Sequence, residues 1–224
     1  RNRDVQNRVI AAVIDTMQRK GYQGLDVDFE YIPREDSDGF LEFLENATTQ
    51  LHAAGYPVHV DLAPKTYDDQ PGLLYEAHNY SEIGKIVDTV LLMTYEWGYA
   101  YGPPLAVAPL DQVRQVVSYA VGEIPREKIL MGIPNYGYDW TLPFEKGDKA
   151  TNIGNQYAVR LAARYGAEIQ FDARAASPYF RYRDEQGRSH IVWFEDIRSI
   201  EAKYALLDEF SLLGSGYWTI MRPF

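Results

Sequence analysis

Three acidic residues alternate with apolar residues in the segment 24–30 (GLDVDFE), at positions Asp26, Asp28 and Glu30. Alternation of period two predicts a β-strand, because successive side chains of a strand point to opposite faces. Acids on one face, roughly 6–7 Å apart, repel one another, and this repulsion raises the pKa of a carboxyl group among them. A carboxyl group that keeps its proton near neutral pH can act as a general acid.

The same pattern has a second interpretation, a solvated strand at the edge of a sheet. Two features argue against that interpretation. Asp and Glu are poor strand formers, and the apolar face of Leu25, Val27 and Phe29 is bulky enough to need a covering layer. We therefore expect the acids to point into a confined polar space.

The bulk properties of the chain limit its partners. Its 224 residues are enough for one sizeable core. A net charge of −10 argues against nucleic acid and anionic membranes as partners, but not against a neutral polymer. We find no apolar run long enough to span a bilayer and no signal peptide. The first residue is Arg rather than Met, which suggests a processed start.

Aromatic side chains are abundant, with 18 Tyr, 9 Phe and 4 Trp, and such residues form core or stack on sugar rings. The absence of Cys excludes disulfides and thiol chemistry. The four histidines show no ligand spacing, although His59 lies on a predicted strand and suits a core or supporting position. A metal site made from Asp26, Asp28 and Glu30 is an alternative, but one strand alone rarely offers good geometry for a metal ion. We therefore predict neither a metal nor a cofactor.

Helices and strands are predicted to alternate through the first 137 residues, which indicates an α/β fold with a parallel sheet. We expect helices over 4–20, 37–54, 75–85 and 110–122, and strands over 24–30, 57–63, 87–95 and 128–134. The rhythm then changes to a helix over 155–165 and short strands near 167–172, 179–183 and 189–194. A helix over 195–210 and a strand over 214–220 complete the chain.

Four motifs occur along the chain in an order that resembles glycoside hydrolase family 18, the chitinase-like TIM (β/α)8 barrels. Residues 23–30 (QGLDVDFE) match the family's Asp-x-x-Asp-x-Asp-x-Glu, with Gln23 replacing the first Asp. Residues 93–96 (MTYE) match Met-x-Tyr-Asp, with Glu96 replacing Asp, and residues 132–137 (GIPNYG) match Gly-x-Pro-x-Tyr-Gly. Trp218 corresponds to the family's final-strand Trp. The segments MTYEWGY, GIPNYGYDW and GYW are most similar to the spore-germination branch, whose members are cortex-lytic N-acetylglucosaminidases.

The resemblance implies a partial barrel that consists of strands four to eight. Residues 1–137 and 195–224 would form the barrel part, and residues 138–194 an α+β insertion after strand seven. We expect either a fragment of a longer enzyme, which we favour, or self-association of copies through open sheet edges.

The resemblance also implies the catalytic residues. Glu30 would protonate the glycosidic oxygen and then act as a base toward water, while Asp28 would orient the substrate's acetamido group, which attacks in place of an enzyme nucleophile. Asp26 would share a proton or charge with Asp28. Tyr95 would donate a hydrogen bond to the acetamido oxygen, or it is a core tyrosine. The product would retain its anomeric configuration.

Further residues are implied as substrate contacts. Glu96 would bind a sugar hydroxyl, and Trp218 would form the floor under the reacting sugar, although a buried core position is an alternative. Tyr136 and Asn135 are weaker candidates. Trp97, together with Tyr99 and Tyr101, would stack on glycan or merely pack its loop.

We therefore predict a retaining hydrolase of polymers that contain N-acetylglucosamine, with peptidoglycan favoured over chitin. An extracellular, cell-wall or spore-associated location would fit such a substrate. Two alternatives stay open, a chitinase-like lectin that binds glycan without cutting it and an inactive fragment of a longer hydrolase. Lectins of this family typically lose the catalytic Glu, and the presence of Glu30 favours the enzyme.

Overall fold

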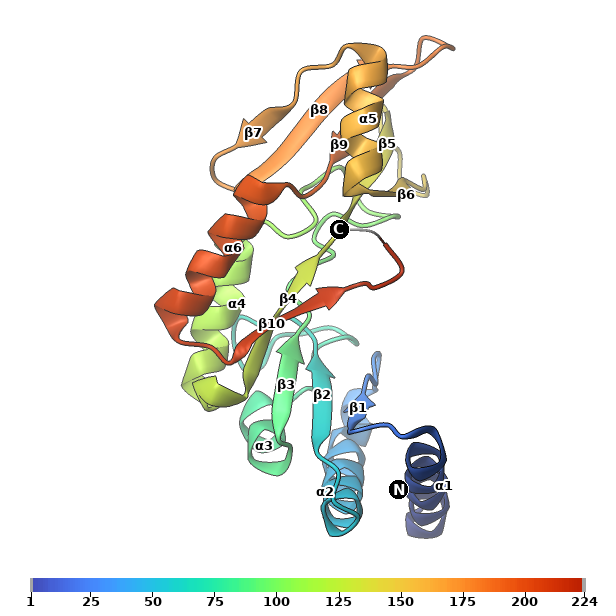
Figure 1. Cartoon of the computed structure of the whole chain (residues 1–224), viewed down its shortest axis with the longest axis vertical. Coiled ribbons are helices and arrows are strands. Elements are labelled where there is room, and N and C mark those ends of the chain that lie inside the picture. The colour runs from blue at the N-terminus through green and yellow to red at the C-terminus, as the bar shows by residue number, and fades with distance from the viewer. Residues whose placement is uncertain (1, 223–224) are drawn as a thin grey trace. The chain divides into compact units, whose positions relative to one another are not determined.

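The computed structural model describes residues 2–222 and has an α/β fold with two five-stranded sheets (Figure 1). The helices are α1 (Arg3–Lys20), α2 (Ser37–Ala53), α3 (Tyr80–Ile86), α4 (Leu110–Glu123), α5 (Asn155–Tyr165) and α6 (Ile197–Phe210), with 3-10 turns at Arg34–Asp36 and Arg126–Lys128. The strands are β1 (Leu25–Val27), β2 (Val58–Leu62), β3 (Thr89–Leu92), β4 (Ile129–Pro134), β5 (Tyr136–Leu142), β6 (Thr151–Gly154), β7 (Gln170–Asp172), β8 (Ser177–Arg183), β9 (Ser189–Trp193) and β10 (Gly214–Trp218). None of the described helices is long and apolar enough to cross a membrane.

The first sheet has the strand order β1-β2-β3-β4-β10, and β1 to β4 pair in parallel. This arrangement confirms the predicted α/β alternation. The described strands form an open sheet and do not close a barrel. The register places Asp26 beside His59 on β2, and His59 beside Thr89 on β3.

The chain divides into two compact units, and each is described by itself. The first unit holds the residues up to Met93 together with Val116–Met131 and Phe210–Gly214. In it α1 packs against α2, and α2 packs against β2 and α3 (Figure 1). The buried face of α2 repeats at helical spacing through Leu44, Ala47 and Leu51, all fully buried.

Capping residues explain how α1 leads into β1. The side chain of Asn2 accepts a hydrogen bond of 3.1 Å from the backbone N–H of Val5, which satisfies one of the free donors of the first turn. At the other end Gly21 has φ of +72° and donates its N–H to the carbonyl of Met17. Glycine adopts this left-handed conformation without a Cβ clash, so the helix ends there and the chain turns toward β1.

The strand predicted over 24–30 is shorter in the structure. β1 ends at Val27, so the expectation that Glu30 is the last residue of the strand was wrong. Phe29 does not enter the core, because its side chain is 49% exposed and stacks on Phe40 and Phe43 with ring centroids 6.0 and 5.4 Å apart. The low strand propensity of Asp and Glu, together with the repulsion among them, accounts for the early end.

The second unit holds Thr94–Gln115, Gly132–Glu209 and the residues from Ser215 on. Its antiparallel sheet has the order β6-β5-β9-β8-β7, and α5 packs on it over a core that includes Phe180, Val192 and Phe194 (Figure 1). The helix predicted over 155–165 coincides with α5, and β7, β8 and β9 lie close to their predicted positions. Strands β5 and β6 were not predicted.

Two further elements differ from the prediction. The helix predicted over 75–85 begins only at Tyr80, because Asn79 caps it by accepting a hydrogen bond of 3.1 Å from the N–H of Glu82. The strand predicted over 87–95 is limited to β3, so Tyr95 lies in the segment that follows the strand.

Candidate active site

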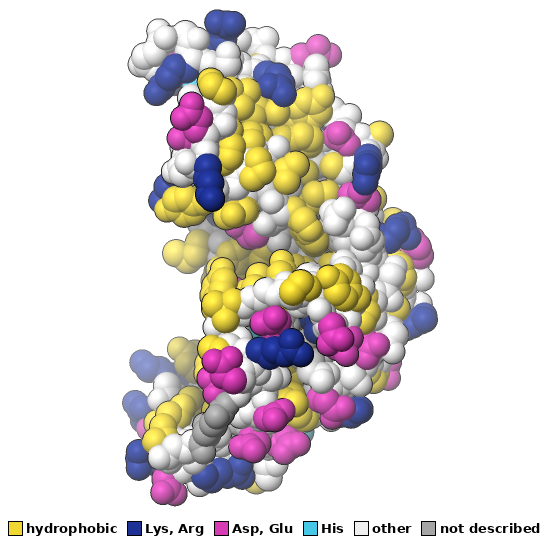
Figure 2. All heavy atoms as spheres, turned by 180° about the vertical axis from the view of Figure 1, so that it is seen from behind, with side chains coloured by type: hydrophobic (Ala, Val, Ile, Leu, Met, Phe, Trp, Pro, Cys, Tyr) yellow, Lys and Arg dark blue, Asp and Glu magenta, His cyan; other side chains and the backbone are white. Residues whose placement is uncertain are grey.

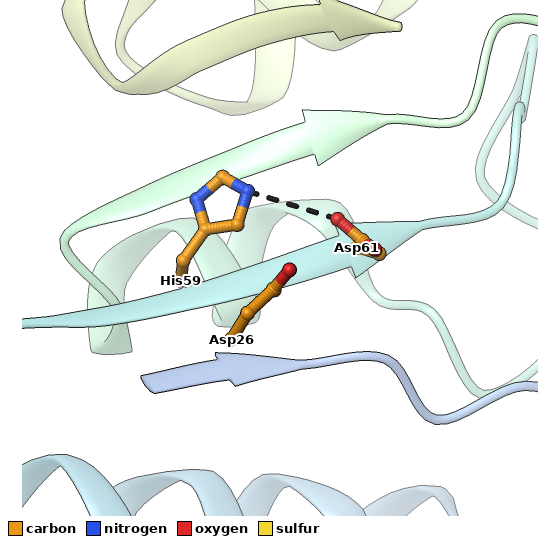
Figure 3. A group of neighbouring side chains, drawn as sticks. All are labelled: Asp26, His59 and Asp61. Atoms are coloured by element: carbon orange, nitrogen blue, oxygen red, sulfur yellow. Dashed lines mark ion pairs between the residues drawn. The ribbon is translucent and has the colours of Figure 1, made fainter. Parts of the chain in front are cut away.

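The acidic residues of β1 meet two side chains of β2. Figure 3 shows the carboxylate of Asp26 pointing toward His59 and Asp61. One oxygen or nitrogen atom of each of the three lies within 4.8 Å of the others. The parallel register is the cause, because His59 is the direct partner of Asp26 and Asp61 follows two residues later on the same face. We call Asp26, Asp28, Glu30, Asp61 and His59 the acid cluster.

The basic member of the acid cluster is His59. Its Nδ1 lies 2.7 Å from the hydroxyl oxygen of Thr89, and its Nε2 lies 3.7 Å from Oδ1 of Asp61. Burial lowers the pKa of His59, and the nearby charge of Asp26 opposes this shift. The imidazole therefore supplies little positive charge near neutral pH to offset the carboxylates.

Burial and mutual repulsion raise the pKa of three carboxyl groups of the cluster. Burial is the largest cause for Asp26 and Glu30, and the charge of Asp28 adds to it in both, while His59 lowers the pKa of Asp26. Asp61 is only 6% exposed, and burial followed by the charges of Asp26, Asp28 and Glu30 raises its pKa to about 7. By contrast Asp26, Asp28 and Glu30 are all exposed, so the expected confined polar space is not found around them.

Asp26, His59 and Asp61 are also the residues to consider for a cation. They offer one imidazole nitrogen and two carboxylate oxygens, with separations of up to 4.8 Å. Mg²⁺ and Ca²⁺ take six or more oxygen ligands, and Zn²⁺ draws its ligands to about 2 Å. Three ligand atoms spread over up to 4.8 Å fall short of what these ions require.

A second polar group lies in the second unit and is centred on Glu96. The hydroxyls of Tyr136 and Tyr138 donate hydrogen bonds of 2.6 and 2.9 Å to the same oxygen, Oε1 of Glu96. Burial, followed by the charge of Glu96, raises the pKa of both tyrosines, so they remain donors over the physiological pH range. Tyr95 is buried and its hydroxyl also raises the pKa of Tyr136, so the two rings lie near each other.

Asn135 is 2% exposed and is bonded to the segment that follows β10. Its side chain accepts from the N–H of Thr219 at 2.7 Å and donates to the carbonyl of Thr219 at 2.9 Å, and its own N–H donates to the carbonyl of Trp218 at 3.1 Å. These bonds hold the end of β10 in place. Trp218 itself is 50% exposed, so the alternative of a buried core tryptophan was wrong.

Trp97 lines a pocket of about 370 Å³ together with Leu105, Pro109 and Trp193. Trp193 stacks on Tyr179 with ring centroids 4.6 Å apart, and Figure 2 shows hydrophobic side chains gathered over the part of the chain that carries β8 and β9. The loop tyrosines Tyr99 and Tyr101 are 43% and 58% exposed. The pocket gives Trp97 an aromatic neighbour that its loop sequence did not predict.

The structure thus gathers the predicted site residues into two groups. Asp26, Asp28 and Glu30 belong to the first unit, whereas Tyr95, Glu96, Trp97, Asn135, Tyr136 and Trp218 belong to the second. Sequence reasoning did not identify Asp61 or Tyr138 as site residues. Gln23, at the first motif position, is exposed and donates from Nε2 to the carbonyl of Gly21 at 2.9 Å.

Comparison with known proteins shows the family to which the chain belongs. Residues 1–222 match the family described as Glycosyl hydrolases family 18. The cortical fragment-lytic enzyme of Bacillus subtilis (strain 168) is 45% identical over 221 residues, which cover 98% of this chain and 51% of that protein. The crystal structure of the Bacillus megaterium QM B1551 spore cortex-lytic enzyme SleL has a TM-score of 0.96 at 46% identity and covers 100% of this chain and 51% of that one.

A chitinase is also similar to the chain. The crystal structure of chitinase from Chromobacterium violaceum ATCC 12472 has a TM-score of 0.91 at 29% identity, covering 99% of this chain and 69% of that one. The chain spans about half the length of curated relatives that it matches.

Proposed function

Because the chain belongs to the glycosyl hydrolases of family 18, we propose that it carries the acid–base residues of a glycosidase that cleaves β-linked N-acetylglucosamine polymers. The observation that supports this most directly is the acid cluster, in which Glu30 has a pKa raised by burial and by Asp28. A general acid must hold its proton near the working pH. Two carboxyl groups with different environments can then divide the acid and charge-bearing roles between them.

In this mechanism Glu30 protonates the glycosidic oxygen while the substrate's own acetamido oxygen attacks the anomeric carbon. Asp28 accepts the acetamido N–H and orients that group, and Asp26 supports the charge of Asp28. Tyr95 donates a hydrogen bond to the acetamido oxygen. Water activated by Glu30 then opens the cyclic intermediate, so the product retains its configuration.

We assign β1, β2, β3, β4 and β10 to strands four to eight of a TIM barrel, and residues 138–194 to an α+β insertion after strand seven. In such barrels the reacting groups lie at the C-terminal ends of the strands. The position of Asp28 and Glu30 just after β1 agrees with that rule. The edge strand β1 leaves backbone groups open to pairing, and light scattering of the chain would test whether copies associate through it.

Contacts with the sugar are proposed for the second group. Glu96 binds a sugar hydroxyl, and the two tyrosine donors orient its carboxylate for this role. Trp218 forms an apolar floor, which its exposure permits. Trp97, Tyr136 and Asn135 are secondary candidates, and the buried bonds of Asn135 favour a supporting position over direct contact.

We propose spore cortex peptidoglycan as the substrate and a spore-associated location, because two close relatives are named as cortex-lytic or cortical fragment-lytic enzymes. The chitinase among the structural neighbours makes chitin the second candidate. No cofactor is needed for this chemistry, since protons and the substrate's acetamido group perform it.

The experiment is hydrolysis of a fluorogenic N-acetylglucosaminide, and of purified cortex fragments, by the chain and two variants. Glu30→Gln should lower the rate by roughly 10²–10⁴-fold, the usual contribution of a general acid. Glu42→Gln removes an exposed carboxylate of α2 and should leave the rate unchanged. Glycan binding without any release of reducing ends would overturn the hydrolase proposal in favour of the glycan-binding alternative.

A further inference from the structure

The segment that follows β1 is held by a side chain from another part of the first unit. The ladder between β1 and β2 ends with the pair of Val27 and Val60. Phe29 and Glu30 follow beyond that pair, yet the carbonyl oxygen of Phe29 lies 3.0 Å from Nε2 of His78. His78 precedes α3 and is only 1% exposed. A buried imidazole therefore contacts the residue next to the proposed general acid.

Both ring nitrogens of His78 are bonded, and their partners determine the tautomer. Nδ1 lies 2.8 Å from the backbone nitrogen of Ala63, which can only donate, so Nδ1 accepts. The carbonyl of Phe29 can only accept, so Nε2 carries the proton and donates. Burial lowers the pKa of His78, the bond to Phe29 raises it, and the charge of Lys65 lowers it. The neutral imidazole thus bridges the segment after β2 and the segment after β1.

Buried hydrogen bonds around the imidazole hold it in place. Nζ of Lys65 donates a hydrogen bond of 3.1 Å to the carbonyl of His78. The hydroxyl of Tyr80 donates to the carbonyl of Ala63 at 2.5 Å and accepts from the N–H of Lys65 at 3.0 Å. All four residues are at most 2% exposed. Because bonded polar groups in the interior make their surroundings rigid, Nε2 of His78 is a donor with a fixed direction.

The ring of Phe29 is held as well as its carbonyl. It stacks on Phe40 and Phe43 of α2, with ring centroids 6.0 and 5.4 Å apart. The ring of Phe40 also lies 6.0 Å from the imidazole of His78, so the two contacts share a neighbour. Glu30 follows Phe29 in the chain and is itself exposed. The position of its carboxyl group therefore depends on the backbone that Phe29 anchors.

We propose that His78 is a positioning residue of the hydrolytic site, which holds the carbonyl of Phe29 and thereby fixes the backbone that carries Glu30. The inference rests on the proposed function, in which Glu30 is the general acid. His78 touches no reacting atom in this scheme. Displacement of a reacting group by about 1 Å can lower a rate by about 100-fold, so the loss of a bond one residue away from Glu30 is enough to change turnover.

Two replacements of His78 separate the two bonds of the imidazole. Asn places its Oδ1 near the position of Nδ1, so His78→Asn keeps an acceptor for Ala63 and loses the donor to Phe29. Gln places its Nε2 near the position of the imidazole Nε2, so His78→Gln keeps the donor to Phe29 and loses the acceptor beside Ala63. Each variant lacks one buried bond, so a merely structural histidine would change the rate equally in both.

Hydrolysis of the fluorogenic N-acetylglucosaminide should distinguish the two variants. His78→Asn should lower kcat by about 10–100-fold with an unchanged KM, whereas His78→Gln should retain most of the wild-type kcat. An equal loss in both variants, or no loss in either, overturns the inference. The control is His52→Asn, which replaces an exposed histidine of α2 whose Nε2 lies 2.8 Å from Asp88, and it should leave kcat unchanged.

Two NMR measurements on the whole chain at neutral pH require no turnover. The ¹⁵N shifts of the His78 ring should show the Nε2–H tautomer, and a charged ring or the Nδ1–H tautomer overturns the inference. The backbone amide of Glu30 should have an order parameter of about 0.85 in the wild type and in His78→Gln, and below about 0.6 in His78→Asn. An unchanged order parameter in His78→Asn would show that the bond to Phe29 does not hold this segment.

Together these measurements separate the inference from the proposed function. A wild type that does not hydrolyse glycan, with a mobile Glu30 amide in His78→Asn alone, would overturn the function and leave the positioning of Glu30 standing. Hydrolysis by the wild type with an equally ordered Glu30 in both variants would overturn the inference and leave the function standing. If His78→Asn does not fold, His78→Gln decides, because wild-type order and kcat support the inference and a mobile Glu30 amide overturns it.

Discussion

The acid cluster and the Glu96 group surround their carboxyl groups in opposite ways. In the acid cluster four carboxyl groups and one weakly basic imidazole lie together, and the pKa values of Asp26, Glu30 and Asp61 are raised. At Glu96 two tyrosine hydroxyls donate to a single oxygen at 2.6 and 2.9 Å. Neighbouring acids oppose the ionisation of a carboxyl group, whereas hydroxyl donors fix the position of the oxygen that they contact. The first arrangement suits proton transfer, and the second suits a carboxylate that is held in one orientation.

A third acid, Glu195, is a buried carboxyl group whose partner is a lysine. Glu195 and Lys203 are fully buried in the second unit, and their charged atoms lie 2.8 Å apart. Burial raises the pKa of Glu195, while the charge of Lys203 lowers it. The pair holds α6 to the segment after β9. This buried ion pair has a structural role, and the acid cluster and the Glu96 group can be compared with it.

We expect the largest effect on stability from Lys203→Met. The variant leaves Glu195 buried without its partner, and such losses cost about 3–5 kcal/mol. Urea denaturation would measure this as a reduced free energy of unfolding. The double variant Lys203→Met with Glu195→Gln should recover much of the loss, because no isolated charge remains. Failure of the double variant to recover stability would mean that the cost came from packing and not from charge.

In the acid cluster we expect that replacing an acid increases the stability of the protein as the pH rises. A group whose pKa is raised on folding stabilises the protein at low pH, and that contribution is lost as the pH rises through the folded value. For Asp61, with a pKa of about 7 against 3.8, the loss between pH 5 and pH 8 is roughly 2–3 kcal/mol. Asp61→Asn should therefore gain stability relative to the wild type by this amount between the two pH values. Parallel pH profiles of the two proteins would contradict the raised pKa.

The acid cluster shows which of its members the sequence could reveal. Asp26, Asp28 and Glu30 are adjacent in the chain, so their alternation alone predicted mutual repulsion. Asp61 joins them only through the register of β1 and β2, which pairs Asp26 with His59. Once that register is known, the alternation of segment 57–63 (PVHVDLA) places His59 and Asp61 on the same face as Asp26. Period-two patterns give the face of a residue but not its partner strand.

The elements of the fold also divide into those that the sequence predicted and those that it did not. Apolar runs predicted β3 and β4 because burial decides their structure, whereas β2 was predicted from a segment that also carries His59 and Asp61. Strand β1 is short because its acids resist the pairing that the alternation suggests. Strand β5 was missed although Tyr136, Tyr138 and Trp140 alternate along it and are buried. Their alternation follows directly on residues 132–137, whose Pro134 and Gly137 favour the end of a strand.

At Glu96, Tyr136→Phe should have an effect of intermediate size. It removes the shorter of the two hydrogen bonds to the carboxylate, and bonds to charged groups contribute about 1.5–3 kcal/mol. We expect a lower free energy of unfolding by about this amount, measured by urea denaturation, and weaker binding of glycan. If Glu96 acts only through the sugar, the stability would be unchanged and only binding would fall.

The smallest effect is expected from Tyr138→Phe. Its bond to Glu96 is longer, at 2.9 Å, and the Tyr136 hydroxyl continues to hold the same oxygen, so the loss should be about 0.5–1.5 kcal/mol. The double variant sharpens the comparison, because two donors to one oxygen are coupled and their losses should not add. A double loss larger than the sum of the single losses would mean that each tyrosine can compensate for the other. Strict additivity would mean that the two hydroxyls act independently, and Glu96 would then lack the fixed orientation that distinguishes it from the acid cluster.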